Sequence, residues 1–224
     1  MKKWFKGAIV AITAAAFALC LCACSAGSSS GSSASSANSA SGSASSATSA
    51  SSSSAVQSVQ AGDSGKTLVA YFSATGNTAP LAQYAADALD ADLFEIEAAQ
   101  PYTDQDLNYN DQSTRATTEQ HDASARPEIS GQLPDLDGYD TVVIAYPIWW
   151  GDEPRIVDTF VEGVDLSGKT VAAFCTSGGS GIGSSDKNLA ALADPSATWL
   201  EGHRFAPGAS QAEVESWLRS IGLL

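Results

Sequence analysis

From Lys66 onward, short apolar runs alternate with segments whose apolar residues recur at helical spacing. The run from Thr141 to Tyr146 contains no charged residue, which is typical of a strand buried on both faces of a parallel sheet. Strands and helices that alternate in this way pack as layers, because each helix covers one face of the sheet. The sequence therefore predicts an α/β domain built on a doubly wound parallel sheet.

The expected elements can be placed along the chain. Strands are expected at 68–72, 92–96, 141–146, 170–175 and 199–205, and helices near 79–89, 155–161, 185–192 and 210–221. Ser210 and Glu213 form the pattern of a capping box at the start of the last helix. The polar stretch 100–136 is expected to hold one short helix near 112–120. Its Tyr102 and Tyr109 either reach a ligand or pin the stretch to the domain, and we favour pinning.

The first 64 residues are expected to lie outside this domain. Basic residues precede the apolar segment 7–21, which is short for a membrane span and resembles the core of a secretory signal. Leu21-Cys22-Ala23-Cys24 resembles a bacterial lipobox, so residues 1–23 are interpreted as a lipoprotein signal peptide and Cys24 as the lipidation site. The alternative is an ordinary signal whose cysteines are packing residues.

Residues 24–64 consist almost entirely of Ser, Ala and Gly. They contain too few apolar side chains to offset the entropy lost on ordering, so they are predicted to form a disordered tether. Residues 65–224 are long enough for one domain with a sizeable core. Cys175 is the only cysteine in that part, which excludes a disulfide within the domain.

The charge of the chain limits its partners. The full chain carries −14, and removal of residues 1–23 deletes three lysines and no acid, which leaves −17. Such an acidic protein is a poor partner for nucleic acid and for anionic lipid. Attachment to the cell membrane, on its extracytoplasmic face, is therefore assigned to the lipid anchor. No side chains show the spacing of metal ligands or of a nucleophilic triad.

A hydroxyl-rich loop follows the first expected strand and precedes a helix. We call it the phosphate loop, and it reads Ser73-Ala74-Thr75-Gly76-Asn77-Thr78. Backbone N–H groups, hydroxyls, an amide and the positive end of the helix dipole suit a phosphate group. No Lys follows Gly76, so the loop differs from the P-loop of nucleotide triphosphatases. The alternative is a Ser/Thr-capped turn without a ligand.

Two further loops leave the carboxyl ends of expected strands, where ligands bind in open α/β sheets. Pro147-Ile148-Trp149-Trp150-Gly151 carries two large aromatic rings, and Ser177-Gly178-Gly179-Ser180-Gly181 lets the backbone approach a flat ring closely. These loops beside a phosphate cradle indicate a planar heterocycle with a phosphate tail. FMN fits better than a dinucleotide, because no G-x-G-x-x-G follows the first strand. The alternative for the Trp pair is a core or lid role.

Together, the three motifs resemble the flavodoxin-like flavoproteins from about Lys66 to Leu224. The resemblance implies a five-stranded sheet in the order 2-1-3-4-5 and an FMN phosphate bound by Thr75–Thr78. It places the isoalloxazine ring between Pro147–Gly151 and Ser177–Gly181. It also implies electron transfer to a redox partner protein or a small-molecule acceptor. An FMN-dependent oxidoreductase of the NAD(P)H or quinone reductase type and a non-redox ligand-binding lipoprotein are the alternatives.

Overall fold

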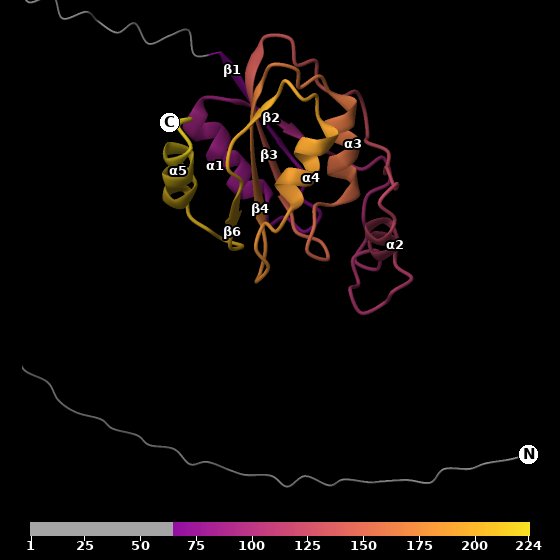
Figure 1. The fold of residues 1–224 in the computed structure, drawn as a ribbon. Helices are drawn as coiled ribbons and strands as arrows, with labels where there is room; N and C mark the ends of the chain where they lie inside the picture. The colour runs from indigo at the N-terminus through magenta and orange to yellow at the C-terminus, as the bar shows by residue number, and fades with distance from the viewer. Residues whose placement is uncertain (1–64) are drawn as a thin grey trace, which may run out of the picture. The chain divides into compact units, whose positions relative to one another are not determined.

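The computed structural model describes residues 65–224, so the expected signal peptide, Cys24 and the tether lie outside the described residues. Two layers of helices enclose one sheet (Figure 1). Helices α1 (Ala79–Leu89) and α5 (Gln211–Ser220) cover one face, and α3 (Arg155–Gly163) and α4 (Ser185–Leu192) cover the other. This arrangement is the doubly wound α/β architecture that the alternating pattern predicts.

The sheet order is β2-β1-β3-β4-β5, and all neighbouring strands are parallel, which confirms the expected order. The strands are β1 (Lys66–Tyr71), β2 (Asp92–Glu95), β3 (Tyr139–Pro147), β4 (Thr170–Thr176), β5 (Thr198–Trp199) and β6 (His203–Phe205). The expected strand at 199–205 is thus divided into β5 and β6, which both pair with β4.

A register change explains this division. Val171 pairs with Trp199, and Phe174 pairs with His203, so the edge strand advances by four residues while β4 advances by three. One extra residue in one strand of a pair is a β-bulge, which interrupts the ladder locally. The sequence pattern did not reveal the bulge, because apolar spacing alone does not record the register of a neighbouring strand.

The central strands bury both faces, as the run at 141–146 predicts. Residues 142–146 of β3 are 0% exposed, and their side chains alternate between two apolar cores. One core packs against α3 and α4, and the other packs against α1 and α5. Cys175 of β4 lies in the first core, where burial raises the pKa of its thiol to about 12. It is therefore a neutral packing side chain.

The insertion between β2 and β3 carries the short helix α2 (Arg115–His121), which lies beyond the carboxyl ends of the central strands (Figure 1). The helix begins three residues later than expected because the Thr114 side chain caps it, accepting a hydrogen bond from the N–H of Thr117. The Tyr102 hydroxyl donates to Glu119 of α2 at 2.6 Å, and the Tyr102 ring packs edge-on against Phe72 and Trp149. Tyr102 therefore pins the insertion to the domain.

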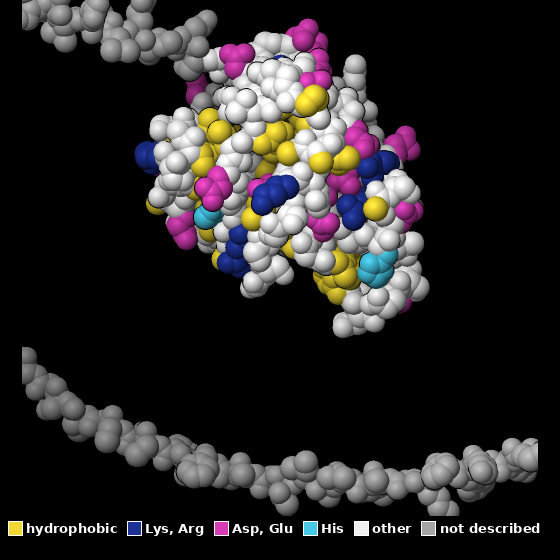
Figure 2. Space-filling view, in the orientation of Figure 1, with side chains coloured by type: hydrophobic (Ala, Val, Ile, Leu, Met, Phe, Trp, Pro, Cys, Tyr) yellow, Lys and Arg dark blue, Asp and Glu magenta, His cyan; other side chains and the backbone are white. Residues whose placement is uncertain are grey.

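The surface of the described domain is strongly acidic. Figure 2 shows Asp and Glu side chains spread over the face that it draws. Within residues 65–224, no helix is both long enough and apolar enough to cross a membrane. Over the same residues, no group of three or more His, Cys, Asp and Glu side chains is placed to hold a metal ion.

Candidate functional site

The carboxyl ends of β1, β3 and β4 bring the three predicted loops together. The N–H of Phe72, directly before the phosphate loop, donates to the carbonyl oxygen of Ala145 in β3 at 2.9 Å. The N–H of Ile148 donates to the carbonyl oxygen of Thr176 at 3.0 Å, and the hydroxyl oxygens of Thr78 and Thr176 lie 2.8 Å apart. Each loop is thus tied to a neighbour at the same edge of the sheet.

The phosphate loop has the geometry of an anion site. Ser73 Oγ accepts hydrogen bonds from the N–H groups of Thr78 and Ala79 at 3.1 and 3.2 Å, so it caps α1. Residues 75–77 between them are exposed, and within the described domain their N–H groups have no protein acceptor. Free N–H donors at a helix N-terminus attract a phosphate group. The chemistry of this donor set therefore fits a phosphate.

The hydroxyl groups of the phosphate loop have different surroundings. Thr75 is exposed, and its Oγ1 accepts a hydrogen bond from the Asn77 side chain at 3.0 Å. Thr78 is 1% exposed and shares a hydrogen bond with Thr176. A hydroxyl carries one donor and two acceptor positions, so Thr78 can accept from Thr176 and still donate to a ligand. Thr75 is the more accessible of the two.

Residues 149–152 form a tight hairpin turn, which we call the Trp150 turn. The N–H of Trp149 donates to the Asp152 carbonyl oxygen at 2.9 Å, and the N–H of Asp152 donates back to Trp149 at 3.0 Å. Trp150 and Gly151 have φ values of +49° and +89°, as in a type I′ turn. Such turns favour Asn-Gly, and a bulky residue with positive φ is an outlier. This kind of strain often marks a functional position.

The two tryptophans of this turn have different environments. Trp149 is 2% exposed, and its ring packs edge-on against Phe72 and Tyr102 at centroid distances of 5.5 and 5.1 Å. Trp150 is partly exposed, and the Tyr109 ring lies 4.7 Å from it. Trp149 is therefore a core residue, whereas Trp150 is presented at the edge of the site. The sequence pattern did not distinguish between them.

The third loop, residues 177–181, has an anchored base and an exposed tip. The N–H of Ser177 donates to the Phe205 carbonyl oxygen at 3.1 Å, and the Arg204 guanidinium donates to the Ser177 carbonyl oxygen. Residues 178–181 are exposed, and a Cβ added to Gly178 or Gly179 would meet no atom within 4 Å. This open backbone surface can accept a flat ring.

A cavity of about 320 Å³ adjoins the phosphate loop on its β2 side. Ser73 and Ala74 line it together with Tyr102 and residues 95–99, but no residue of 147–151 or 177–181 does. It is therefore separate from the space that the second and third loops border.

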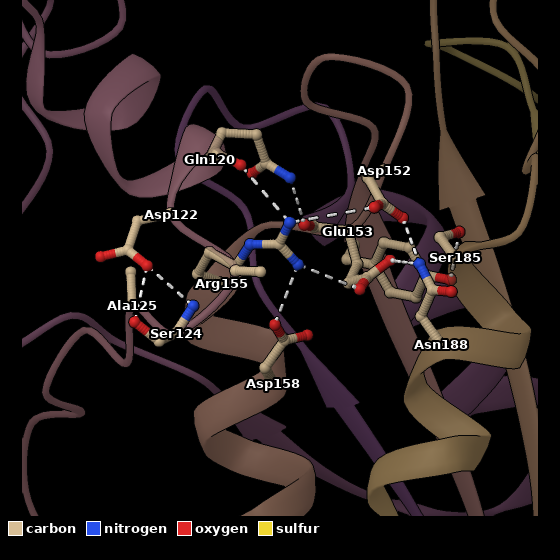
Figure 3. A network of polar contacts seen from close by, with 12 residues as sticks. Gln120, Asp122, Ser124, Ala125, Asp152, Glu153, Arg155, Asp158, Ser185 and Asn188 are labelled. Carbon is tan, nitrogen blue, oxygen red and sulfur yellow. Dashed lines mark hydrogen bonds and ion pairs between the residues drawn. The ribbon is translucent and has the colours of Figure 1, made fainter.

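A buried polar network behind the Trp150 turn was not found by sequence reasoning. Glu153, Arg155, Asp158 and Asn188 form it, and Figure 3 shows them converging from the turn, α3 and α4. Charged residues at a helix start resemble an ordinary solvated first turn in a sequence. No sequence signal separates that case from a buried network.

Comparisons with known proteins agree with this geometry. The family model described as flavodoxin matches residues 66–221. A candidate flavoprotein of Bacteroides uniformis shares 44% identity with a TM-score of 0.66, covering 69% of this chain and 98% of its own. A similar protein of Bacteroides eggerthii also shares 44% identity, with a TM-score of 0.65 and coverage of 70% and 98%.

A more distant solved structure shares the fold. It is a Lactobacillus acidophilus flavoprotein in complex with FMN, with 23% identity, a TM-score of 0.52 and coverage of 68% of this chain and 98% of its own. The search of curated proteins found no match. The family match extends over nearly the whole described domain and includes all three loops. The chain therefore belongs to the flavodoxin family.

Proposed function

We propose that residues 65–224 bind FMN and transfer electrons. The observation that carries this proposal is the meeting of three loops at one edge of the sheet: a phosphate loop with free N–H donors, an exposed tryptophan and an open glycine backbone. The flavodoxin family match supports FMN as the cofactor, as does the structural relative that holds FMN. When bound, FMN supplies the redox chemistry, and the protein supplies position and electrostatics.

In this proposal, the chain holds the FMN phosphate with neutral donors. The N–H groups of residues 75–77 and the Thr75 hydroxyl are accessible to it, and the positive end of the α1 dipole adds attraction. The loop contains no Lys or Arg. No cation of the loop itself therefore compensates the phosphate charge, and the loop holds the phosphate by directed hydrogen bonds.

Trp150 and the loop at 177–181 border the place proposed for the ring. Trp150 presents an aromatic face, and the glycine backbone opposite carries no side chain that would keep a flat ring away. Tyr109 of the insertion is 50% exposed, and its ring packs beside Trp150 and covers part of that indole. Stacking of this kind orients a flavin and limits the access of water to one of its faces.

We also propose that acyl chains on Cys24 hold the domain at the extracytoplasmic face of the cell membrane. The lipobox pattern and the Ser/Ala/Gly-rich segment after it support this location. The electron-transfer partner is then a redox protein or a small-molecule acceptor outside the cytoplasm. An acidic domain favours partners with a complementary basic surface.

An anaerobic reductive titration of the FMN-loaded protein tests electron transfer most directly. A one-electron carrier is expected to take up electrons in two resolved steps, and we expect this result. Uptake of two electrons in a single step would instead identify an FMN-dependent reductase. A purified protein without a flavin spectrum, and without affinity for added FMN, would leave only a non-redox binding protein.

We expect FMN to bind at least about tenfold more tightly than riboflavin, because riboflavin leaves the donors of residues 75–77 without an acceptor. A hydrogen bond to a charged group contributes about 1.5–3 kcal/mol, and about 1.4 kcal/mol corresponds to tenfold in affinity. Quenching of flavin fluorescence measures both affinities. Thr75→Val should lower FMN affinity, whereas Thr198→Val on β5 is the matched control. Equal affinities for FMN and riboflavin would contradict phosphate binding.

Trp150→Asn should weaken FMN binding without lowering the free energy of unfolding of the flavin-free protein. Asn suits the left-handed position, and relief of about 1–3 kcal/mol of strain exceeds the loss of an aromatic contact of about 0.5–1.5 kcal/mol. Denaturant unfolding and a fluorescence titration measure the two quantities. Trp150→Phe, which keeps an aromatic ring and the strain, is the control. A lower free energy of unfolding together with unchanged FMN affinity in Trp150→Asn would refute the proposal that Trp150 contacts the flavin ring.

Cys24→Ser should abolish acylation and release the protein from the membrane fraction. Two acyl chains anchor a protein stably, and a chain with a net charge of −17 after residue 23 is not attracted to anionic lipid in their place. Fractionation of expressing cells measures the outcome, with Cys22→Ser as a control that should stay in the membrane. A mature-sized Cys24→Ser protein in the membrane pellet would show that another group anchors it.

A further inference from the structure

Glu153 directly follows the Trp150 turn and is the most deeply buried acid of residues 65–224, with 1% exposure. Pro154 and α3 come next, so its backbone joins the turn to the helix. A carboxylate is costly to remove from water unless it is paired or neutralised. The position of this acid behind the turn therefore needs an explanation.

Three elements meet at Glu153 (Figure 3). Its backbone carbonyl oxygen accepts a hydrogen bond from Gln120 Nε2 of α2 at 3.0 Å. Its side-chain Oε2 accepts from Asn188 Nδ2 of α4 at 3.3 Å, and the same nitrogen donates to Asp152 Oδ1 at 2.7 Å. Glu153 is thus bonded to α2 and to α4, and Asp152, the last residue of the Trp150 turn, is bonded to α4.

Three acids surround one guanidinium in this network. Arg155 Nη1 lies 3.1 Å from Asp158 Oδ2 and 3.4 Å from Glu153 Oε1. Arg155 Nη2 lies 3.9 Å from Asp152 Oδ2. The short contact goes to Asp158, and the contact to Glu153 is at the limit of a hydrogen bond. Arg155 therefore pairs mainly with Asp158.

A second guanidinium does not remove the excess of acids. Arg126 lies 3.6 Å from Asp158, but its stronger pair is with Glu162 at 2.7 Å. Four carboxyl groups thus face two guanidinium groups. Burial raises the pKa of Glu153 to about 9, and the adjacent Asp152 carboxyl acts in the same direction. The geometry and the charge balance both favour a proton on Glu153.

The remaining groups that face Glu153 do not supply a compensating charge. Burial raises the pKa of Asp158 on α3, although both nearby guanidinium groups oppose this rise. The Tyr146 phenol on β3 is kept neutral because burial raises its pKa. The contacts from α2 and α4 are the amides of Gln120 and Asn188, which carry no charge.

We propose that Glu153 is a positioning residue for the flavin site: as a neutral buried acid it fastens the Trp150 turn to α4, and loss of its proton releases the turn and weakens flavin binding. An ionised Glu153 would lie near Asp152 and Asp158, and the guanidinium beside it, Arg155, is already paired more closely with Asp158, so repulsion would push the turn outward. The part of this inference that concerns flavin rests on the proposed function.

The sign of the pH dependence follows from proton binding. The folded chain holds the Glu153 proton up to about pH 9, whereas an unfolded glutamate loses it near the ordinary pKa of 4.5. Between these values the folded state binds one proton more, so the contribution of Glu153 to the free energy of unfolding falls as pH rises. That contribution is complete below about pH 4.5 and is lost above about pH 9. Glu153→Gln removes this dependence.

The ¹H–¹⁵N signal of the Trp150 indole in the flavin-free full chain tests, without any cofactor, whether protonated Glu153 holds the Trp150 turn. The variant Trp150→Phe assigns the signal. We expect the wild-type signal to shift with a midpoint near the raised pKa of Glu153, about 9. Glu153→Gln should abolish this shift. Glu128→Gln, which changes an exposed acid outside the network, should retain it. Asn188→Ala should move the signal toward its high-pH position already at neutral pH.

The FMN affinities of wild type and Glu153→Gln, compared at about pH 7 and about pH 9.5, test the effect on the flavin site. The two should agree at the lower pH, and the variant should bind at least about threefold more tightly at the higher pH. An indole signal that does not shift with pH in the wild type, or an equal shift in Glu153→Gln, would overturn the claim that protonated Glu153 holds the Trp150 turn. Equal FMN affinities of wild type and variant at the higher pH would overturn the role of Glu153 in flavin binding. Absence of FMN binding at both values would instead contradict the proposed function, while the indole result stands by itself.

Discussion

The parallel pairing of β1, β3 and β4 is the constraint on which the rest of the structure depends. Tyr71 pairs with Ala145, and Pro147 pairs with Thr176, so the three strands end at the same edge. Because the side chains of these strands alternate between two close-packed cores, a shift in register by one residue would exchange the side chains of the two cores and disrupt their packing. The apolar cores therefore place the phosphate loop, the Trp150 turn and the loop at 177–181 side by side, although residues 79–176 separate the first from the last.

The Trp150 turn departs from what folding alone favours. A bulky side chain occupies a left-handed position, and an acid whose ion pair with Arg155 is long, at 3.4 Å, is buried directly behind it. Either feature lowers stability when considered alone. They occur three residues apart, at Trp150 and Glu153, at the edge proposed for the flavin ring, as expected if the geometry of this turn serves the proposed binding. The hydrogen bonds from α2 and α4 hold the arrangement in place.

Much of the fold follows from local sequence patterns. Apolar runs locate the central strands, the Ser210–Glu213 pair locates α5, and the composition of the three loops identifies the candidate site. The bulge between β5 and β6 depends on the register with β4, which leaves no local signal. The different burial of Trp149 and Trp150 depends on Phe72, Tyr102 and Tyr109, which are distant in sequence. The buried network could not be predicted for the same reason.

A crystal structure of the FMN-loaded protein is the most direct measurement of the central claim. We expect the phosphate to accept hydrogen bonds from the N–H groups of residues 75–77. We also expect the isoalloxazine ring to lie against Trp150, between residues 147–151 and 177–181. A flavin ring seated in the cavity of about 320 Å³ on the β2 side, or a phosphate held away from the loop, would contradict it.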